Sequence, residues 1–493
     1  MTPPTTYAVD CGTVTTTAHA DGSGGPVELA VAVVYSNGAR VAQDPVVYLD
    51  GGPGAASIQS LLRDSIPFTS VLEDHDLVLF DQRGTGFSTP RPDCNLADTE
   101  VMTLGPPASD GGVTPATDGG SPSLSSEIAR CRTEAEGLAE LSMFRSSENA
   151  ADVVAVQRAL GYGHVTLYGI SYGTRYALTV LRDHPANVTS AVIDSVVPLQ
   201  VDLISEQGAN VYHAIHLVGT ACSGQSSCVE TYGDVESKEL AVLERMSAKA
   251  PSVTLGDGST VTVQASIVAS LLVNFLYSPE TISLLPELVQ ELSDGDYSAL
   301  AVLSSANNRT SSVIDTATYL SVTCADEAPF SSPAALEQGL AAVPAAWRKW
   351  VAPSSLFDTC RVWDVPASPE IENQAVTSAI PTLVASGRFD PVTPPSYGAL
   401  AATTLSRSRV VVFDGEAHGS TIGACGELVL HEFLNDPSGA FGDSCEADSR
   451  LAFQSLGARE PGGAAIRFDT SRRRPSDDTI EAAVRRFPFP IFR

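Results

Sequence analysis

Val165-Thr-Leu-Tyr-Gly-Ile-Ser-Tyr-Gly-Thr-Arg-Tyr-Ala-Leu178 is the stretch that decides the fold. Its short apolar run, residues 165–168, predicts a β-strand, and the residues after Gly173 have helical spacing. Between them lies a G-x-S-x-G pattern, in which a serine occupies a tight turn that joins a strand to a helix. Gly169 and Gly173 give the room that such a turn requires. We therefore expect Ser171 to project from the carboxyl edge of a sheet as a candidate nucleophile.

The overall composition excludes several classes of protein. The 493 residues are 43% hydrophobic and 18% charged, which is typical of a globular protein. The formal net charge of −29 repels phosphate backbones and anionic lipid surfaces, so we expect no nucleic-acid partner and no membrane partner. No segment is long and apolar enough to suggest a membrane span. Nothing in the sequence calls for an obligate protein partner.

The nine cysteines carry information about the compartment. None belongs to a C-x-x-C pair, so zinc ribbons and thioredoxin-type redox centres are disfavoured. Their spacing allows four disulfides with Cys11 left over, namely Cys94 with Cys131, Cys222 with Cys228, Cys324 with Cys360, and Cys425 with Cys445. Disulfides imply an oxidising compartment, so we expect a secreted, periplasmic or cell-envelope protein. Residues 1–6 do not resemble a signal peptide, and a cytoplasmic protein with free thiols stays the alternative.

Strand and helix patterns alternate along most of the chain. Short apolar runs predict strands at 27–36, 45–49, 76–80, 165–168, 190–197, 381–386 and 409–413. Helical spacing is seen at 148–160 and dominates the segment 199–375, with helices expected at 206–220, 237–248, 263–277 and 286–292. This alternation predicts an α/β fold with a mostly parallel central sheet and helices on both faces.

The same patterns predict the domain organisation. Residues 1–198 and 376–450 form the two parts of the sheet domain, and residues 199–375 form an inserted, mainly helical cap. Residues 451–493 form a carboxyl-terminal tail. Residues 105–127 lack apolar periodicity, which predicts an exposed loop.

A serine nucleophile needs a base, and the base needs an acid that fixes its orientation. In this architecture the three follow in the order serine, acid, histidine, each at the end of a strand. Among the histidines after Ser171, only His418 directly follows a predicted strand, in a Gly-rich loop. Asp390 ends the preceding strand segment and leads into a proline-rich loop, so it is the expected acid. Asp414 is the alternative, but it lies too near His418 in sequence to face it easily.

Backbone amides must also stabilise the negative charge that develops on a substrate carbonyl. Asp50-Gly-Gly-Pro-Gly54 follows an early predicted strand, so Gly52 N–H and Tyr172 N–H are the expected donors of this oxyanion hole. The rival interpretation is a dinucleotide-binding loop, because Gly52–Ser57 nearly spells G-x-G-x-x-G. Its third glycine is missing, so we expect no cofactor. No cluster of metal ligands is evident, and we expect no metal.

Four segments together resemble the α/β-hydrolases of the prolyl and tripeptidyl aminopeptidase group. The likeness is closest to the tripeptidyl-aminopeptidase-like branch, which has a cysteine-bearing segment after the catalytic histidine. The resemblance extends over about Cys11 to Cys445, and the tail beyond Arg450 has no recognised counterpart. The segments are Leu49-Asp-Gly-Gly-Pro-Gly54, Asp81-Gln-Arg-Gly-Thr-Gly-Phe-Ser88, Leu167-Tyr-Gly-Ile-Ser-Tyr-Gly-Thr-Arg175 and Gly387-Arg-Phe-Asp-Pro-Val-Thr-Pro394.

The resemblance implies an α/β-hydrolase fold and the roles given above to Ser171, Asp390, His418, Gly52 and Tyr172. It also implies that cap carboxylates hold the free ammonium group of a peptide substrate. The candidates are Asp326 and Glu327, in the segment Val322-Thr-Cys-Ala-Asp-Glu-Ala-Pro-Phe330. One departure is Asp50, which stands where the family commonly has His, Pro or Asn.

We therefore expect a serine hydrolase, namely an exopeptidase that releases short peptides or single residues from free N-termini through an acyl-enzyme. The alternative is a carboxylesterase or amidase that acts on small esters or lactones with the same three side chains, because the family includes both activities. A non-catalytic binding protein on a hydrolase scaffold is a third possibility, and the intact Ser/Asp/His set argues against it.

Overall fold

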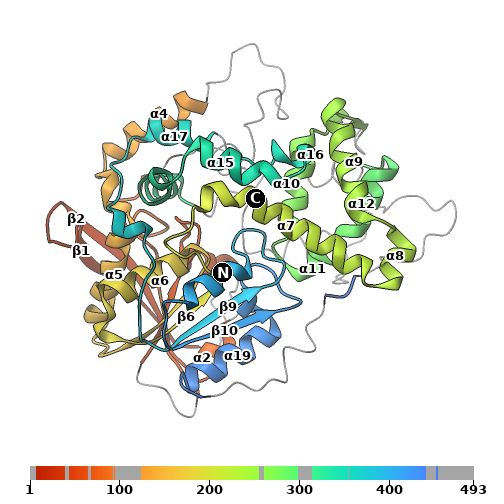
Figure 1. Ribbon diagram of the computed structural model, residues 1–493. Helices are drawn as coiled ribbons and strands as arrows, with labels where there is room; N and C mark the ends of the chain where they lie inside the picture. Colours follow the sequence, from red (N-terminus) through yellow and green to blue (C-terminus); the bar gives the residue numbers. More distant parts are fainter. Residues whose placement is uncertain are drawn as a thin grey trace.

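The computed structural model describes residues 7–38, 44–64, 68–92, 94, 124–254, 260–297, 314–353, 355–439 and 451–453. Its centre is an eight-stranded sheet with the order β1-β2-β4-β3-β5-β6-β9-β10 (Figure 1). The strands are β1 (Val9–Thr17), β2 (Pro26–Val34), β3 (Val46–Leu49), β4 (Leu77–Phe80), β5 (Val165–Ile170), β6 (Val188–Asp194), β9 (Thr382–Gly387) and β10 (Ser408–Phe413). The pairs β1–β2 and β2–β4 are antiparallel and the other pairs are parallel, which confirms the predicted mostly parallel sheet.

Helices cover both faces of the sheet, and alternate residues of each strand contact different layers. Val31 and Val33 of β2 belong to one core, whereas Ala32 and Val34 belong to the other. The first core is covered mainly by α4 (Leu124–Glu136), α5 (Ser146–Leu160), α6 (Tyr172–Asp183), α14 (Thr316–Val322), α17 (Leu356–Trp363) and α18 (Pro395–Ala402). The second core is covered by α1 (Ser57–Asp64), α2 (Thr69–Leu72) and α19 (Ala424–Asn435).

A third core belongs to a mainly helical body above the sheet (Figure 1). It is built from α7 (Leu203–Ser223), α8 (Ser226–Tyr232), α9 (Val235–Ala248), α10 (Ala265–Phe275), α11 (Pro279–Ile282), α12 (Leu285–Asp294), α15 (Pro333–Gly339) and α16 (Ala345–Arg348), with a small hairpin of β7 (Ser252–Thr254) and β8 (Thr260–Thr262). Phe389 and Ala417 join this core from the sheet domain. The helical body therefore packs directly on the loops that carry Asp390 and His418.

The segment 199–375 contributes to more than one core. Ala317 and Leu320 of α14 and Trp363 of α17 pack in the core of the sheet domain, not in that of the helical body. Short helices complete the architecture, namely η1 (Leu141–Phe144), η2 (Pro185–Asn187), the π-helix η4 (Thr323–Glu327), η5 (Ala328–Phe330), η6 (Leu340–Ala342), η7 (Glu370–Asn373) and η8 (Ser420–Ile422). Among the described residues, no helix has the length and apolar character that a membrane crossing requires.

Three differences from the sequence-based expectations have local causes. The apolar-run criterion misses β1, an edge strand in which most side chains are exposed and threonine is frequent. The strand expected at 190–197 ends at Asp194, because Ser195 has a φ of 59°. The loop expected at 105–127 lies mostly outside the described residues, and its last four residues begin α4. The expected tail is described only at 451–453.

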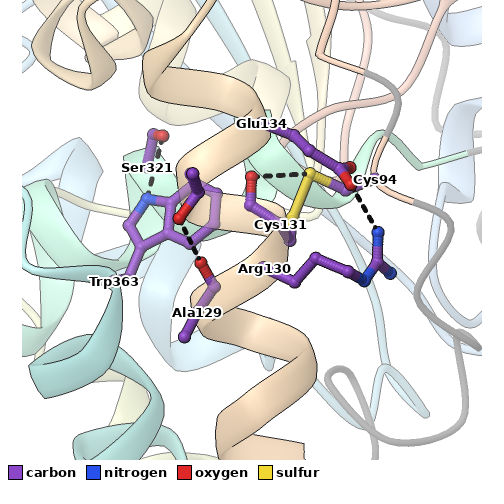
Figure 2. The surroundings of a disulfide bond; sticks show 8 residues. Cys94, Ala129, Arg130, Cys131, Glu134, Ser321 and Trp363 are labelled. Atoms are coloured by element: carbon purple, nitrogen blue, oxygen red, sulfur yellow. Dashed lines mark hydrogen bonds and ion pairs between the residues drawn. A yellow bond between two sulfur atoms is a disulfide. The ribbon is translucent and has the colours of Figure 1, made fainter.

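Three of the expected disulfides are present: Cys94–Cys131, Cys222–Cys228 and Cys324–Cys360. Figure 2 shows the first, which links α4 to the chain after β4 close to the buried indole of Trp363. Cys425 is also disulfide-bonded, and its expected partner, Cys445, lies outside the described residues. Cys11 is free and exposed on β1.

A buried arginine joins the turn between β1 and β2 to the helical layer. Arg83 is only 1% exposed, and its Nε and Nη2 donate to the Asp152 carboxylate of α5 at 2.7 and 2.6 Å. Its Nη1 donates to the carbonyl oxygens of Ala18 and Met143. One guanidinium group therefore joins the turn after β1 to η1 and α5.

We predict that Asp152→Ala lowers the free energy of unfolding by about 3–5 kcal/mol, because it leaves the Arg83 charge buried without its partner. Urea unfolding followed by circular dichroism measures this loss. The control is Asp358→Ala, which breaks an ion pair with Arg361 whose side chains are 71% and 73% exposed and should change stability little. Equal effects of the two substitutions would contradict the structural role of the buried pair.

Candidate active site

Ser171 lies at the junction of β5 and α6 with a φ of 59°, a left-handed conformation that is rare outside glycine. Its N–H donates to the Asp194 carbonyl at 3.0 Å, and its own carbonyl accepts from Thr174 N–H at 2.9 Å. Strain of this kind persists only where the surrounding structure fixes it, and it is frequent at active sites. Ser171 therefore occupies the strand–turn–helix position that its sequence context predicts.

The two glycines of this turn allow close backbone packing. A Cβ atom on Gly169 would lie 2.2 Å from the Gly173 carbonyl oxygen, and one on Gly173 would lie 1.9 Å from the Leu49 carbonyl oxygen. Both distances are far below van der Waals contact. Glycine is therefore required on each side of Ser171, for the steric reason that the sequence suggested.

The expected oxyanion loop lies against the serine. A Cβ on Gly51 would be 3.2 Å from the Ser171 Cβ, and the next residue, Gly52, has a φ of 108° and is exposed. Tyr172 opens α6 on the other side of the serine, at the helix end where an anion is stabilised. The two expected donor residues, Gly52 and Tyr172, therefore belong to segments that flank Ser171.

Asp50, the unusual residue of this loop, turns its carboxylate back onto the loop itself. It is 5% exposed and accepts hydrogen bonds from Gly51 N–H at 2.8 Å and from the Tyr48 hydroxyl at 3.3 Å. Burial raises the pKa of Asp50. The hydrogen bonds of the Asp50 carboxyl group therefore stabilise the conformation of this loop.

His418 and Asp390 form a buried pair. His418 Nδ1 lies 2.8 Å from Asp390 Oδ2, and the two side chains are 3% and 0% exposed. Thr393 donates to Asp390 through its N–H at 2.8 Å and its hydroxyl at 2.6 Å, and Val392 N–H donates at 2.9 Å. Since Asp390 holds Nδ1, the second ring nitrogen of His418, Nε2, is the atom left to accept a proton from a nucleophile.

The pair shifts the pKa of both groups. Burial alone would lower the pKa of His418, but the Asp390 charge and the hydrogen bond with it outweigh burial and raise the pKa. Burial alone would raise the pKa of Asp390, but His418 and the Thr393 donors outweigh it and lower the pKa. The structure therefore favours a carboxylate at Asp390 and stabilises the protonated imidazole that forms during proton transfer.

Backbone contacts bring the histidine loop to the ends of the strands. A Cβ on Gly387, the last residue of β9, would lie 2.0 Å from the Ala417 carbonyl oxygen, so only glycine permits this approach. Phe389 N–H donates to the Glu416 carbonyl at 3.1 Å. β6 lies between β5, which carries Ser171, and β9, which leads to Asp390. Ser171, Asp390 and His418 are thus all held at the same edge of the sheet.

The alternative partners are engaged elsewhere. Asp414 is exposed and pairs with Arg388 at 3.3 Å. His216 on α7 pairs with Glu236, and His431 on α19 pairs with Asp74. None of these contacts involves Asp390 or His418.

Two residues near the pair could not be identified from the sequence. The ring of Tyr277, which follows α10, lies edge-on to His418 with centroids 5.2 Å apart. The hydroxyl of Thr393 lies 3.4 Å from His418 Nδ1 while it donates to Asp390. For Tyr277 the sequence holds no signal, because the contact depends on how the helical body packs. For Thr393 the only signal is its position three residues after the acid.

The candidate ammonium ligands, Asp326 and Glu327, have different surroundings. Asp326 is 1% exposed, and its two oxygens accept from Ser146 N–H at 2.9 Å and from the Ser368 hydroxyl at 2.5 Å. Both of its oxygens already accept from protein donors, and the binding of a substrate ammonium by Asp326 stays a prediction. The carboxylate ties the π-helix η4 to the start of α5.

Glu327 is the better placed of the two. Its side chain is 13% exposed and lies 2.7 Å from Nη1 of Arg175, about one helical turn after Ser171 in α6. Burial raises the pKa of Glu327 to about 7, with Arg175 opposing the rise and Asp326 and Asp202 adding to it. Burial and the neighbouring carboxylates both disfavour its charge, and a cation beside it would offset them.

Comparisons with known proteins identify matching families and relatives of this chain. Residues 44–214 match the α/β-hydrolase fold family, and residues 347–445 match the TAP-like protein family. The chain is 26% identical over 412 residues to serine protease Hip1 of Mycobacterium tuberculosis, covering 78% of this chain and 76% of that protein. It is 27% identical over 457 residues to carboxylesterase B of the same organism, covering 86% and 84%. A tripeptidyl aminopeptidase of Streptomyces lividans is 29% identical over 195 residues, covering 38% of this chain and 35% of that one.

The raised pKa of His418 predicts the pH dependence of any reaction that uses it as a base. The rate of p-nitrophenyl acetate hydrolysis should fall on the acid side with a midpoint above 6.5, the ordinary histidine value, because the imidazole must be neutral to accept a proton. Asp390→Asn should move this midpoint down, since burial then acts on His418 without the opposing charge. It should also reduce the rate by about 10⁴-fold. A wild-type midpoint at or below 6.5 would contradict the pairing.

Proposed function

Because the chain belongs to the α/β-hydrolases with a TAP-like carboxyl-terminal segment, we propose that it is a serine exopeptidase that removes short peptides or single residues from free N-termini. The proposal includes a secreted or cell-envelope location, which the disulfides support. It requires no cofactor and no metal.

In the proposed reaction, Ser171 attacks the substrate carbonyl while His418 accepts its proton and Asp390 stabilises the resulting imidazolium. The N–H groups of Gly52 and Tyr172 donate to the developing oxyanion. His418 then protonates the leaving amine, and water hydrolyses the acyl-enzyme by the same proton transfers in reverse. The buried His418–Asp390 pair and the strained backbone of Ser171 support these roles.

The observation that carries the peptidase assignment is the position of Glu327. It is partly exposed, it pairs with Arg175 about one helical turn after Ser171, and burial, together with two neighbouring carboxylates, raises its pKa to about 7. Three carboxylates, Asp202, Asp326 and Glu327, interact at this cluster, and the guanidinium of Arg175 opposes their repulsion. An ammonium group is the cation that a peptide substrate supplies, and its position sets the distance from the N-terminus to the bond that is cleaved.

A peptide mixture offered with free and with acetylated N-termini tests the proposal. We expect mass spectrometry to show short products released from the free peptides only, because acetylation removes the charge that Glu327 binds. The matched control is Ser171→Ala, which should release nothing from either set. Equal cleavage of both sets, or cleavage of p-nitrophenyl esters with no cleavage of any free peptide, would contradict the exopeptidase assignment.

The pKa of Glu327, near 7, predicts how substrate binding depends on pH. KM for a peptidyl nitroanilide with a free N-terminus should rise as pH falls below 7, because Glu327 becomes protonated and loses its charge. Glu327→Gln should raise KM by about 10-fold or more at pH 7.5 and abolish this pH dependence. p-Nitrophenyl acetate, which has no ammonium group, serves as the control substrate, and its KM should respond to neither change. A Glu327→Gln variant with unaltered KM would exclude this residue as the ammonium site.

The second candidate function is a carboxylesterase or amidase for small esters or lactones. Two observations favour it. The aromatic ring of Tyr277 lies against His418, which gives the site an apolar wall. The relative named carboxylesterase B matches the chain over 86% of its length. The same peptide experiment separates the two functions.

A further inference from the structure

The end of β6 carries a buried carboxylate that the reaction described above does not use. Asp194 is 0% exposed and is the last residue of this strand. Its backbone carbonyl accepts the Ser171 N–H at 3.0 Å. The main chain of Asp194 therefore holds the nucleophile turn, while its side chain is available for other contacts.

The side chain of Asp194 binds the residues that directly follow His418. Its Oδ1 accepts from Ser420 N–H at 3.1 Å and from the Ser420 hydroxyl at 2.7 Å. Its Oδ2 accepts from Thr421 N–H at 2.7 Å and from the Thr421 hydroxyl at 2.5 Å. Hydrogen bonds to a carboxylate are stronger than those between neutral groups, and four from this loop converge on one buried group. The Ser195 hydroxyl donates a fifth, to Oδ1, at 3.4 Å.

The neighbouring residue completes the same connection. Ser195 has a φ of 59°, which is unusual for a non-glycine residue, and its hydroxyl oxygen accepts the Gly419 N–H at 2.8 Å. Ser195 N–H donates to Ala385 of β9 at 3.0 Å, so its backbone is fixed on the other side as well. Asp194, the last residue of β6, and Ser195, which follows it, thus hold the three consecutive residues after His418.

We propose that Asp194 is a positioning residue that fixes the loop of His418 relative to Ser171. The proposal rests on the serine mechanism given above, and it adds a second buried carboxylate to the Asp390 that binds the imidazole. Asp390 sets the orientation of the ring, whereas Asp194 sets the place of the main chain from which the ring projects. Misplacement of a reacting group by about 1 Å can cost about 100-fold in rate, so such a connection has large kinetic consequences.

The charge of Asp194 adds an electrostatic contribution. It raises the pKa of His418 together with Asp390. The titratable groups that interact with Asp194 are Tyr48, Tyr168, Glu416 and His418. Tyr277 and Asp390 are the other groups against the imidazole. Of these, only His418 becomes positively charged, so loss of the Asp194 charge disfavours the imidazolium.

The test measures covalent labelling of the full-length protein by a fluorophosphonate probe. For Asp194→Asn, the limiting rate kinact should fall about 10- to 100-fold while KI stays within about two-fold, because the probe site is intact and the base is misplaced. The pH midpoint of labelling should also move to lower pH. The matched control is Asp44→Asn, whose carboxylate accepts from Thr189 near the other end of β6 and should affect neither quantity.

A second pair of variants separates position from charge and guards against loss of folding. Both variants keep the Asp194 carboxylate. Ser195→Ala removes the acceptor of the Gly419 N–H and a 3.4 Å hydrogen bond to Asp194. Thr421→Val removes the hydroxyl that bonds both Asp194 and Tyr168. Both should lower kinact without moving the pH midpoint. Thermal unfolding identifies any variant that does not fold, and the folded ones decide the outcome.

The possible results are distinct. Labelling of Asp194→Asn at the wild-type rate, or wild-type kinact in both Ser195→Ala and Thr421→Val, would overturn the positioning role. No labelling of the wild-type protein would instead overturn the serine mechanism on which the proposal rests. Two results together support the positioning role. Asp194→Asn lowers both kinact and the pH midpoint of labelling, whereas Ser195→Ala and Thr421→Val lower kinact without moving the midpoint.

Discussion

The positive φ of Ser171 is the constraint on which the rest of the site depends. A serine can hold this conformation only if the chain packs tightly around it, and Gly169 and Gly173 permit that packing against Leu49. The same turn starts α6, so Tyr172 N–H lies at a helix N-terminus, where negative charge is stabilised. The geometry of the site therefore begins in the backbone, and the side chains are arranged around it.

Much of the site could be predicted because its determinants are local. The glycines around Ser171, the end of a strand at Asp390 and the Gly-rich loop at His418 are all visible in a short window of sequence. The contacts of Tyr277 and Asp194 could not be predicted, because they depend on which distant segments meet. Likewise, the sequence does not show that Asp326 and Glu327, although adjacent, differ in accessibility. A π-helix places one against Ser146 and the other against Arg175.

Two buried arginines organise the charged interior of this acidic protein. Arg83 binds Asp152 of α5 and the Ala18 carbonyl in the turn before β2, and Arg175 joins α6 to η4 through Glu327. Arginine suits both places, because its planar group can donate to a carboxylate and to carbonyl oxygens at once. The Arg83–Asp152 pair is buried within the sheet domain. The second pair includes Arg175, about one helical turn after Ser171, and its carboxylate is still 13% exposed.

The central claim is that the chemistry passes through a covalent intermediate on Ser171. The most direct measurement is to quench turnover of a p-nitrophenyl ester with acid within milliseconds and to locate the acyl group by peptide mapping. The account predicts one acyl group per active site, on the peptide that contains Ser171 and on no other. Product formation without an acylated peptide, or an acyl group on a different side chain, would contradict it.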